Sequence, residues 1–168
     1  STGNATDFGD MTTQCVGPAG ASNRTRGVIA GGEGHAYPSP TRTSDIEYVT
    51  IASKGNSVLF GHMTTIAGDV GGFSNSVRGF FAGGEPSNKR KIDMINIAST
   101  GNSIHFGDLR HGRIVVNGTA SQTRGFIIGG RYEPSAVYVN TIEYVEIASS
   151  GNSLDWGDLT VGRWAGVS

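Results

Sequence analysis

The chain contains one sequence pattern three times, and the three copies differ in length at only one place. Gly-Asn pairs begin at residues 3, 55, 101 and 151, and a Gly-Gly pair ends 29 residues after the first three of them. The stretch from Ile46, Ile92 or Ile142 to the next Gly-Asn pair is 9 residues in every copy. Only the segment between the Gly-Gly pair and that isoleucine varies, at 14, 8 and 12 residues. Because repeat scaffolds change length mainly in surface loops, this segment is the first candidate for a binding region.

The composition is that of an ordered, turn-rich β protein. The 168 residues can form one domain-sized core, and the 27 glycines alternate with regularly spaced β-branched and aromatic residues. The 13 basic and 14 acidic residues nearly cancel, so we expect no nucleic-acid partner. No apolar run reaches the roughly 20 residues of a membrane helix, so we expect no membrane insertion. Cys15 is the only cysteine, which excludes an internal disulfide and leaves the redox compartment open.

Each copy is predicted to form four short strands, which we name a to d. Strand b is the apolar run before the Gly-Gly pair, at 26–30, 78–82 and 124–128, and strand c is expected at 46–53, 92–99 and 142–149. The Gly-Asn pair then predicts a tight hairpin turn. Strand d carries an aromatic-Gly pair, whose ring we expect to anchor the core, and it should also form near the start of the chain, at 4–10. Strand a is the least clear and is expected near 113–117 in the third copy.

Four strands in a unit of 46 to 52 residues match the size of one β-propeller blade. Helical periodicity is absent, so the predicted fold is all-β, with about three four-stranded antiparallel blades and an extra half blade. Residues 1–168 are expected to be a single segment, with repeats at 3–54, 55–100 and 101–150 and a partial repeat at 151–168. In an up-and-down blade, the variable b–c loop lies beside the d–a connection and opposite the Gly-Asn turn.

The repeat resembles the kelch-type propeller repeat, in which a double glycine ends the second strand and an aromatic residue follows in the fourth. The residues that carry this resemblance are Gly31, Gly32, Gly83, Gly84, Gly129 and Gly130, with Phe60, Phe106 and Trp156. The segments GNATDFGDM, RGVIAGG and IEYVTIAS are still more similar to kelch-like repeats in virion and tail-associated proteins of tailed phages, especially marine ones. The resemblance covers essentially the whole chain.

The resemblance implies a non-enzymatic structural or adhesive module of a phage virion, associated with the tail or a fibre. Its partners would be other virion proteins, further blades of the same polypeptide, or a host surface glycan or protein. Two alternatives stay open at this point. One is a cellular, secreted or cell-surface propeller lectin or interaction scaffold, and the other is a fragment of a propeller enzyme whose active site lies elsewhere.

The chain begins and ends in equivalent parts of the repeat. Ordinary propellers close with complementary ends, and single rings have about four or more blades. We therefore expect the chain to be part of a larger propeller, either as a window of a longer polypeptide or as a protomer that completes its ring with other copies.

The variable loops, at 33–45, 85–91 and 131–141, supply the candidate binding residues. Tyrosine and arginine dominate protein interfaces, and tyrosine also stacks on sugars. The candidates are His35, Tyr37, Arg42, Asn88, Lys89, Arg90, Arg131, Tyr132 and Tyr138. Repeated arginines are expected to be scaffold instead, bonded to carbonyls of a neighbouring blade or to carboxylates such as Asp10, Asp108 and Asp158. These arginines are Arg26, Arg78 and Arg124.

No catalytic residue, metal site or cofactor is predicted. General acid and base catalysis needs two carboxylates in different environments, whereas the acidic residues here recur at the same position of each copy. His105 and His111 could meet Asp108 around a loop, but exposed loop histidines are far more common than metal ligands, so no metal site is expected there.

Overall fold

A computed structural model describes residues 3–34, 41–86, 89–114, 116–132 and 135–164. All regular secondary structure in these ranges is β-strand, which confirms the predicted all-β class. Within the same ranges there is no helix that could span a lipid bilayer.

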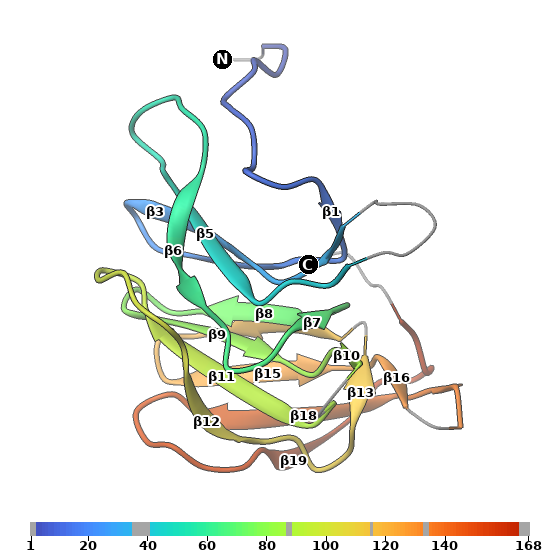
Figure 1. The fold of residues 1–168 in the computed structure, drawn as a ribbon. Coiled ribbons are helices and arrows are strands. Elements are labelled where there is room, and N and C mark those ends of the chain that lie inside the picture. Colours follow the sequence, from blue (N-terminus) through green and yellow to red (C-terminus); the bar gives the residue numbers. More distant parts are fainter. Residues whose placement is uncertain (1–2, 35–40, 87–88, 115, 133–134, 165–168) are drawn as a thin grey trace.

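Twelve of the strands form three four-stranded antiparallel sheets, each in chain order (Figure 1). Sheet 1 consists of β2 (Ala19–Ser22), β3 (Arg26–Ala30), β5 (Asp45–Thr50) and β6 (Val58–His62). Sheet 2 consists of β8 (Gly71–Ser74), β9 (Arg78–Ala82), β11 (Lys91–Asn96) and β12 (Ile104–Asp108). Sheet 3 consists of β14 (Asn117–Ala120), β15 (Arg124–Ile128), β18 (Thr141–Glu146) and β19 (Leu154–Asp158). Each sheet therefore takes strands a, b and c from one sequence repeat and strand d from the next.

The remaining short strands pair each connection that leads into strand a with the following b–c loop. The pairs are β1 (Cys15–Val16) with β4 (Glu33–Gly34), and β7 (Ala67–Gly68) with β10 (Glu85–Pro86). In the third unit, β13 (Arg113–Ile114) pairs with β16 (Arg131–Tyr132), which pairs with β17 (Val137–Tyr138). The variable loops and these connections thus share one end of the sheets, as expected. We call it the loop end.

The predicted strands match the structure unequally. Strand b has the expected bounds in all three sheets, whereas strand c begins one residue earlier and ends three residues earlier than expected. The expectation for strand a at 113–117 was wrong. Residues 113–114 form β13, which lies outside sheet 3, and the first strand of sheet 3, β14, begins at Asn117. The inner strands are glycine-rich because neighbouring backbones nearly touch there: a Cβ on Gly72 would lie 2.2 Å from the carbonyl oxygen of Gly20. Residues 4–10, expected to form a strand d, form no strand.

The constant Gly-Asn pair is not the tight hairpin turn that we expected, because the connection from β5 to β6 runs over residues 51–57. Instead it joins neighbouring sheets. The Gly101 N–H donates to the Phe60 carbonyl at 2.8 Å, and the Asn102 side-chain oxygen accepts from the His62 N–H at 3.0 Å. We call this pair of hydrogen bonds the Gly-Asn joint. It recurs with Gly151 and Asn152 on sheet 2, and with Gly55 and Asn56 on the N-terminal segment.

The Gly-Gly pairs also join successive units. All six of their residues have positive φ, and the second glycine N–H donates to the connection that follows the same sheet. Gly32 donates to the Ala67 carbonyl at 2.9 Å, and Gly84 donates to the Arg113 carbonyl at 3.0 Å. A side chain at φ between +62° and +106° is strained, so these positions require glycine.

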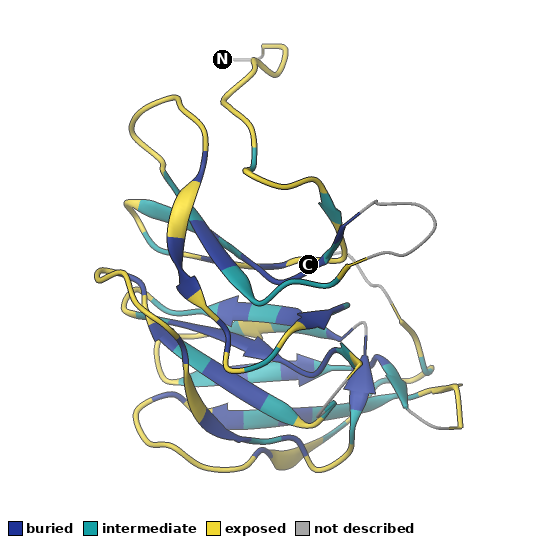
Figure 2. Cartoon of the chain, viewed as in Figure 1, coloured by how far each residue is buried: buried dark blue, intermediate teal, exposed yellow. Residues whose placement is uncertain are grey.

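The hydrophobic core has two parts, one between sheets 1 and 2 and one between sheets 2 and 3. Sheet 2 is therefore buried on both faces (Figure 2). Phe60 and Phe106 are each 3% exposed and anchor these layers, as expected of strand d. Trp156, the third ring expected in the core, is 54% exposed, because no described part of the chain packs against the outer face of sheet 3.

Candidate functional site

The repeated carboxylates Glu47, Asp93 and Glu143 are buried. Asp93 and Glu143 each join two sheets, and Glu47 joins sheet 1 to the N-terminal segment. Asp93, 2% exposed, accepts from the Ser103 hydroxyl at 3.0 Å and from the Thr64 N–H at 2.9 Å. Glu47 and Glu143 make the same pattern of contacts, to Ser57 and Thr12 and to Ser153 and Arg110. All three carboxylates are therefore engaged in structural hydrogen bonds.

Two of the three repeated arginines bridge neighbouring sheets. Arg26 donates to the Ile97 carbonyl at 2.8 Å, and Arg78 donates to the Ile147 carbonyl. Both acceptors are main-chain oxygens of the next sheet, and not the aspartates that we had also considered. Arg124, in the last sheet, instead pairs with Glu146 of its own sheet at 2.8 Å.

At the loop end, most of the predicted cations contact the protein itself. Arg42 bridges Glu33 at 2.9 Å and Glu85 at 2.8 Å, and so ties the loop of sheet 1 to the loop of sheet 2. Lys89 lies 4.0 Å from Glu85. Arg90 donates through Nε to the Leu109 carbonyl at 2.8 Å. This part of the loop end is a balanced ion network, which disfavours anion capture.

Asp69 lies in the same network and has an unusual backbone, with φ of 55°. Burial and the nearby carboxylates of Glu85 and Glu33 raise the pKa of the Asp69 carboxyl, while Arg42 and Arg131 oppose the shift. The ionised form of Asp69 is therefore destabilised in the folded chain relative to a solvent-exposed aspartate.

Beside this network, the third unit forms an open pocket of about 340 Å³. Its lining residues are His111, Arg113, Tyr132, Val139 and Thr141. The rings of His111 and Tyr132 meet edge to face, with centroids 5.9 Å apart. Aromatic walls with a few polar groups are typical of ligand sites.

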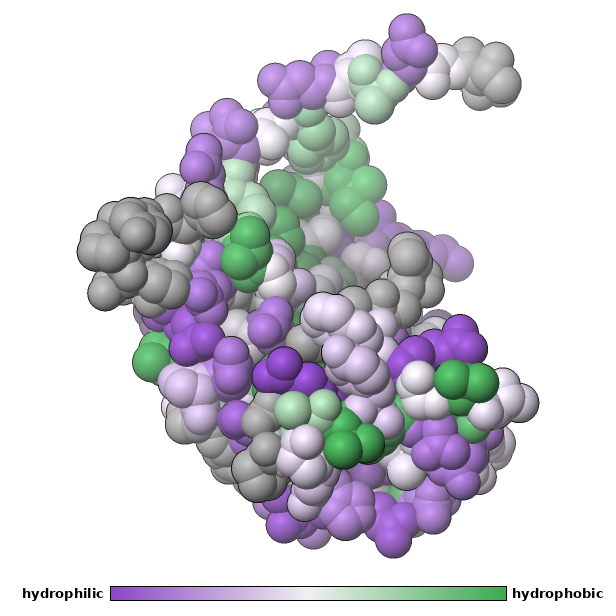
Figure 3. All heavy atoms as spheres, turned by 90° about the vertical axis from the view of Figure 1, so that its right-hand side faces the viewer, coloured by the Kyte–Doolittle hydropathy of each residue, from purple (hydrophilic) through white to green (hydrophobic). Residues whose placement is uncertain are grey.

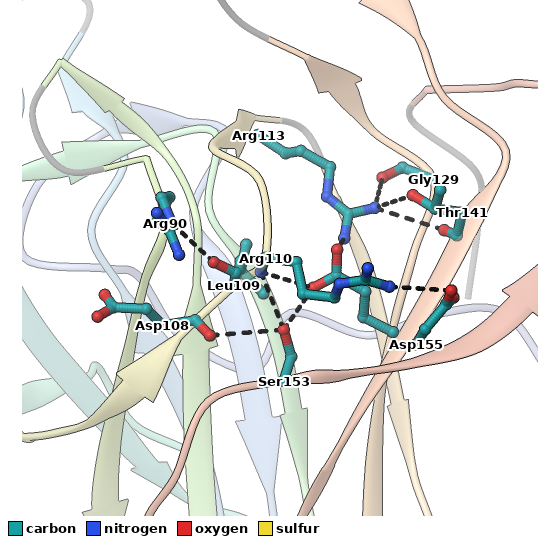
Figure 4. Close-up of polar contacts among 10 residues, drawn as sticks. Arg90, Asp108, Leu109, Arg110, Arg113, Gly129, Thr141, Ser153 and Asp155 are labelled. Carbon is teal, nitrogen blue, oxygen red and sulfur yellow. Dashed lines mark hydrogen bonds and ion pairs between the residues drawn. The ribbon is translucent and has the colours of Figure 1, made fainter.

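Arg113 is the unusual member of this pocket, because it is 1% exposed and forms a buried ion pair with Glu143 (Figure 4). Its Nη1 donates to the Gly129 carbonyl at 3.0 Å and to the Thr141 hydroxyl at 2.7 Å. Its Nε has no hydrogen-bond partner among the described residues. Burial lowers the pKa of the guanidinium, and Glu143 opposes that shift. The equivalent residue of the preceding connection is Ala67, whereas Arg163 holds the same position after sheet 3, where its carbonyl accepts from the Gly130 N–H as that of Arg113 accepts from the Gly84 N–H.

An exposed aromatic pair also marks the loop end. Tyr138 and Trp164 stack with ring planes 9° apart and centroids 5.7 Å apart. Their exposed fractions are 49% and 50%. The surface at this end is mainly hydrophilic with separate hydrophobic patches (Figure 3). Sequence reasoning found Tyr138 but missed Trp164, which lies outside the variable loops.

The structure brings together only part of the predicted site. Tyr132 and Arg131 lie in β16, and Tyr132 lines the pocket. His35, Tyr37 and Asn88 lie outside the described residues. His105 lies 3.9 Å from Asp108, whereas the His111 ring contacts Tyr132. His111 and Arg113 were not among the candidates, although the absence of His111 from the other copies was a usable signal.

No protein-family model matches the chain, and no curated protein is significantly similar to it.

Proposed function

We propose that the chain is a non-enzymatic binding module made of kelch-like propeller blades, with the loop end as its ligand-binding face. Two observations support the propeller arrangement. Strand order in each sheet follows the chain, and the innermost strands β2, β8 and β14 lie side by side. The ring would be completed by further blades of the same kind.

The observation that carries the binding role is the pocket in the third unit. Polar residues that recur in every repeat are engaged in joining sheets, as Asp93 and Arg26 illustrate. The pocket wall instead includes two residues that do not recur, His111 and Tyr132. A scaffold that repeats its structural residues leaves unrepeated ones free for recognition.

A glycan is the ligand class that fits this surface best. Sugars present apolar ring faces and many hydroxyl groups, so they stack on aromatic rings and form hydrogen bonds with polar side chains. Tyr132 and the Tyr138 and Trp164 stack offer aromatic rings, and the exposed His111 beside Tyr132 offers a polar group. Given the resemblance to phage tail-associated repeats, we propose a virion surface as the setting, with a host surface glycan as the ligand.

Glycan-array binding followed by titration calorimetry tests this proposal. Tyr132→Ala and Tyr138→Ala should each weaken binding of an array hit at least about tenfold. Leu59→Ala is the matched control, because Leu59 is 56% exposed on β6, outside the loop end, and should bind like the unaltered chain. An array without hits, or hits that both tyrosine variants retain, would contradict the proposal.

A further inference from the structure

The outer face of sheet 3 carries two aromatic residues whose equivalents are buried in the other two sheets. Arg124, Phe126, Tyr144 and Trp156 make up this face, which we call the open face. The Trp156 ring contacts the rings of Phe126 and Tyr144, with centroids 5.2 and 5.5 Å apart. In sheets 1 and 2 the residues equivalent to Trp156 and Phe126 are 0% to 3% exposed. The open face is thus a core layer without its cover.

Sheet 1 carries the complementary surface. Phe81, Ile95 and Ile97 of sheet 2 pack toward sheet 1 and are at most 3% exposed. The equivalent residues of sheet 3, Ile127, Val145 and Ile147, are at most 2% exposed. In sheet 1 the corresponding residues are Ile29, Val49 and Ile51, of which Ile51 is 47% exposed and the others are half-buried.

Polar groups match between the two surfaces as well. Arg26 and Arg78 donate to the carbonyls of Ile97 and Ile147 on the following sheet. Arg124 is the next donor in this series, and the Ile51 carbonyl is the equivalent acceptor on sheet 1. Within the described ranges, no arginine donates to Ile51.

Gly157 gives a further sign of a close neighbour. It has φ of 150°, nearly the same as Gly9 at 149°. A Cβ on Gly9, Gly61 or Gly107 would lie 2.0 to 2.3 Å from a carbonyl oxygen of the following Gly-Asn joint, whereas a Cβ on Gly157 would meet nothing within 4 Å. β19 therefore has the glycine that the joint requires, but no Gly-Asn pair of a following sheet contacts it.

On sheet 1, the N-terminal segment already occupies the place where such a partner would bind. Gly55 donates to the Phe8 carbonyl at 2.9 Å, and the Asp10 N–H donates to Asn56 at 3.0 Å. Residues 7–10 read DFGD, and residues 155–158 of β19 read DWGD. The two segments therefore fit the same joint, and only one can be bound at a time.

We propose that the open face binds sheet 1 of a second copy of this chain, after residues 8–12 of that copy have left sheet 1. β19 then takes their place in the Gly-Asn joint, and Arg124 donates to the Ile51 carbonyl of the second copy. This contact is head-to-tail, so it repeats until a ring closes or a filament grows. The proposal goes beyond the loop-end function and does not depend on which ligand the loops bind.

Sedimentation velocity on full-length variants tests the proposal. Gly9→Val should expel the N-terminal segment, because its Cβ would lie 2.3 Å from the Gly55 oxygen, while Gly3→Val is the control with nothing within 4 Å. Gly9→Val should self-associate at a concentration at least about tenfold lower than Gly3→Val. Equal association of the two variants, or a Gly9→Val monomer at all accessible concentrations, would overturn the proposal.

A second pair of substitutions, in the Gly9→Val background, locates the interface. Trp156→Lys should abolish association. Leu154→Lys should not abolish it, because the equivalent Val58 and Ile104 stay 49% and 55% exposed in sheets that do have neighbours.

An excess of a synthetic peptide of residues 3–14 should dissociate the Gly9→Val assembly by reoccupying sheet 1. Association that survives both Trp156→Lys and the peptide would refute the proposed surface. Tyr132→Ala should leave association unchanged, which separates this result from the loop-end test.

Discussion

At the scale of single residues, equivalent positions of the repeat make different side-chain contacts. A contact found in only one unit indicates where a binding function can lie. Asp93 and Glu143 hold the same structural hydrogen bonds, yet only Glu143 also pairs with a buried arginine, Arg113. Ala67 holds the position equivalent to Arg113 in the preceding unit, so the backbone contacts at this position do not require an arginine. A buried guanidinium with an unpaired Nε is costly, and such cost is typical of sites that recognise a ligand.

Asp69 gives a prediction about pH. Because its pKa is raised in the folded chain, its ionisation costs the folded state more than the unfolded state. Its contribution to stability is therefore lost as pH rises from the ordinary value of 3.8 through the raised folded pKa. Asp69→Asn removes that loss, and asparagine tolerates the positive φ. The variant should have a higher Tm than the unaltered chain at pH 7, with the difference shrinking toward about pH 3.

Differential scanning calorimetry of both proteins across this pH range is the measurement. Since the two proteins differ only in this side chain, the Tm difference reports the effect of the Asp69 carboxyl. A lower Tm for Asp69→Asn at pH 7, or a difference that does not depend on pH, would contradict the assigned cause.

At the scale of elements, the joints between sheets explain why most repeat lengths are constant. The Gly-Asn joint, the Gly-Gly hydrogen bond and the buried carboxylate each connect one sheet to the next, so an inserted residue would break a contact. The b–c loops lie outside these joints and vary in length. Element stability should therefore depend more on the joints than on surface ion pairs.

Asp93→Ala tests that expectation. It leaves the Ser103 hydroxyl and the Thr64 N–H without their shared acceptor in a buried layer, so we expect a loss of about 2–4 kcal/mol in the free energy of unfolding. Asp155→Ala is the control, because Asp155 pairs with Arg110 at 2.9 Å but is 60% exposed, and its loss should stay within about 0.5 kcal/mol. Urea unfolding measures both, and similar losses would show that the joint carries no special weight.

These elements were predictable from the sequence where a local signal existed. Strand b was found because its apolar residues end at a Gly-Gly pair, and the loop end was found because only one gap varies. Strand a was missed because its glycines, such as Gly72, serve contact between backbones and leave no hydrophobic alternation. The Gly-Asn pair was interpreted as a turn because a joint between distant segments has no local sequence signature. Trp164 was missed for a related reason, since its stacking on Tyr138 is a tertiary contact.

At the scale of the whole molecule, the three sheets differ in how far their faces are covered. Sheet 2 is covered on both faces, whereas sheet 3 leaves Trp156 and Tyr144 partly open to solvent. Sheet 1 is covered on only part of its outward side, by residues 8–12, which form no strand. Stability should therefore decrease from the middle sheet toward both ends of the stack.

Amide hydrogen exchange measures this gradient residue by residue. We expect the slowest exchange in β9 and β11, because opening them disrupts both core layers, and much faster exchange in β19 and in residues 8–12. The experiment needs a dilute and a concentrated sample. If the open face binds sheet 1 of a second copy, β19 should become more protected at high concentration while residues 8–12 lose protection. Protection of β19 equal to that of β11 in the dilute sample would contradict the gradient, because it would mean that the outer face of sheet 3 is already covered within one chain.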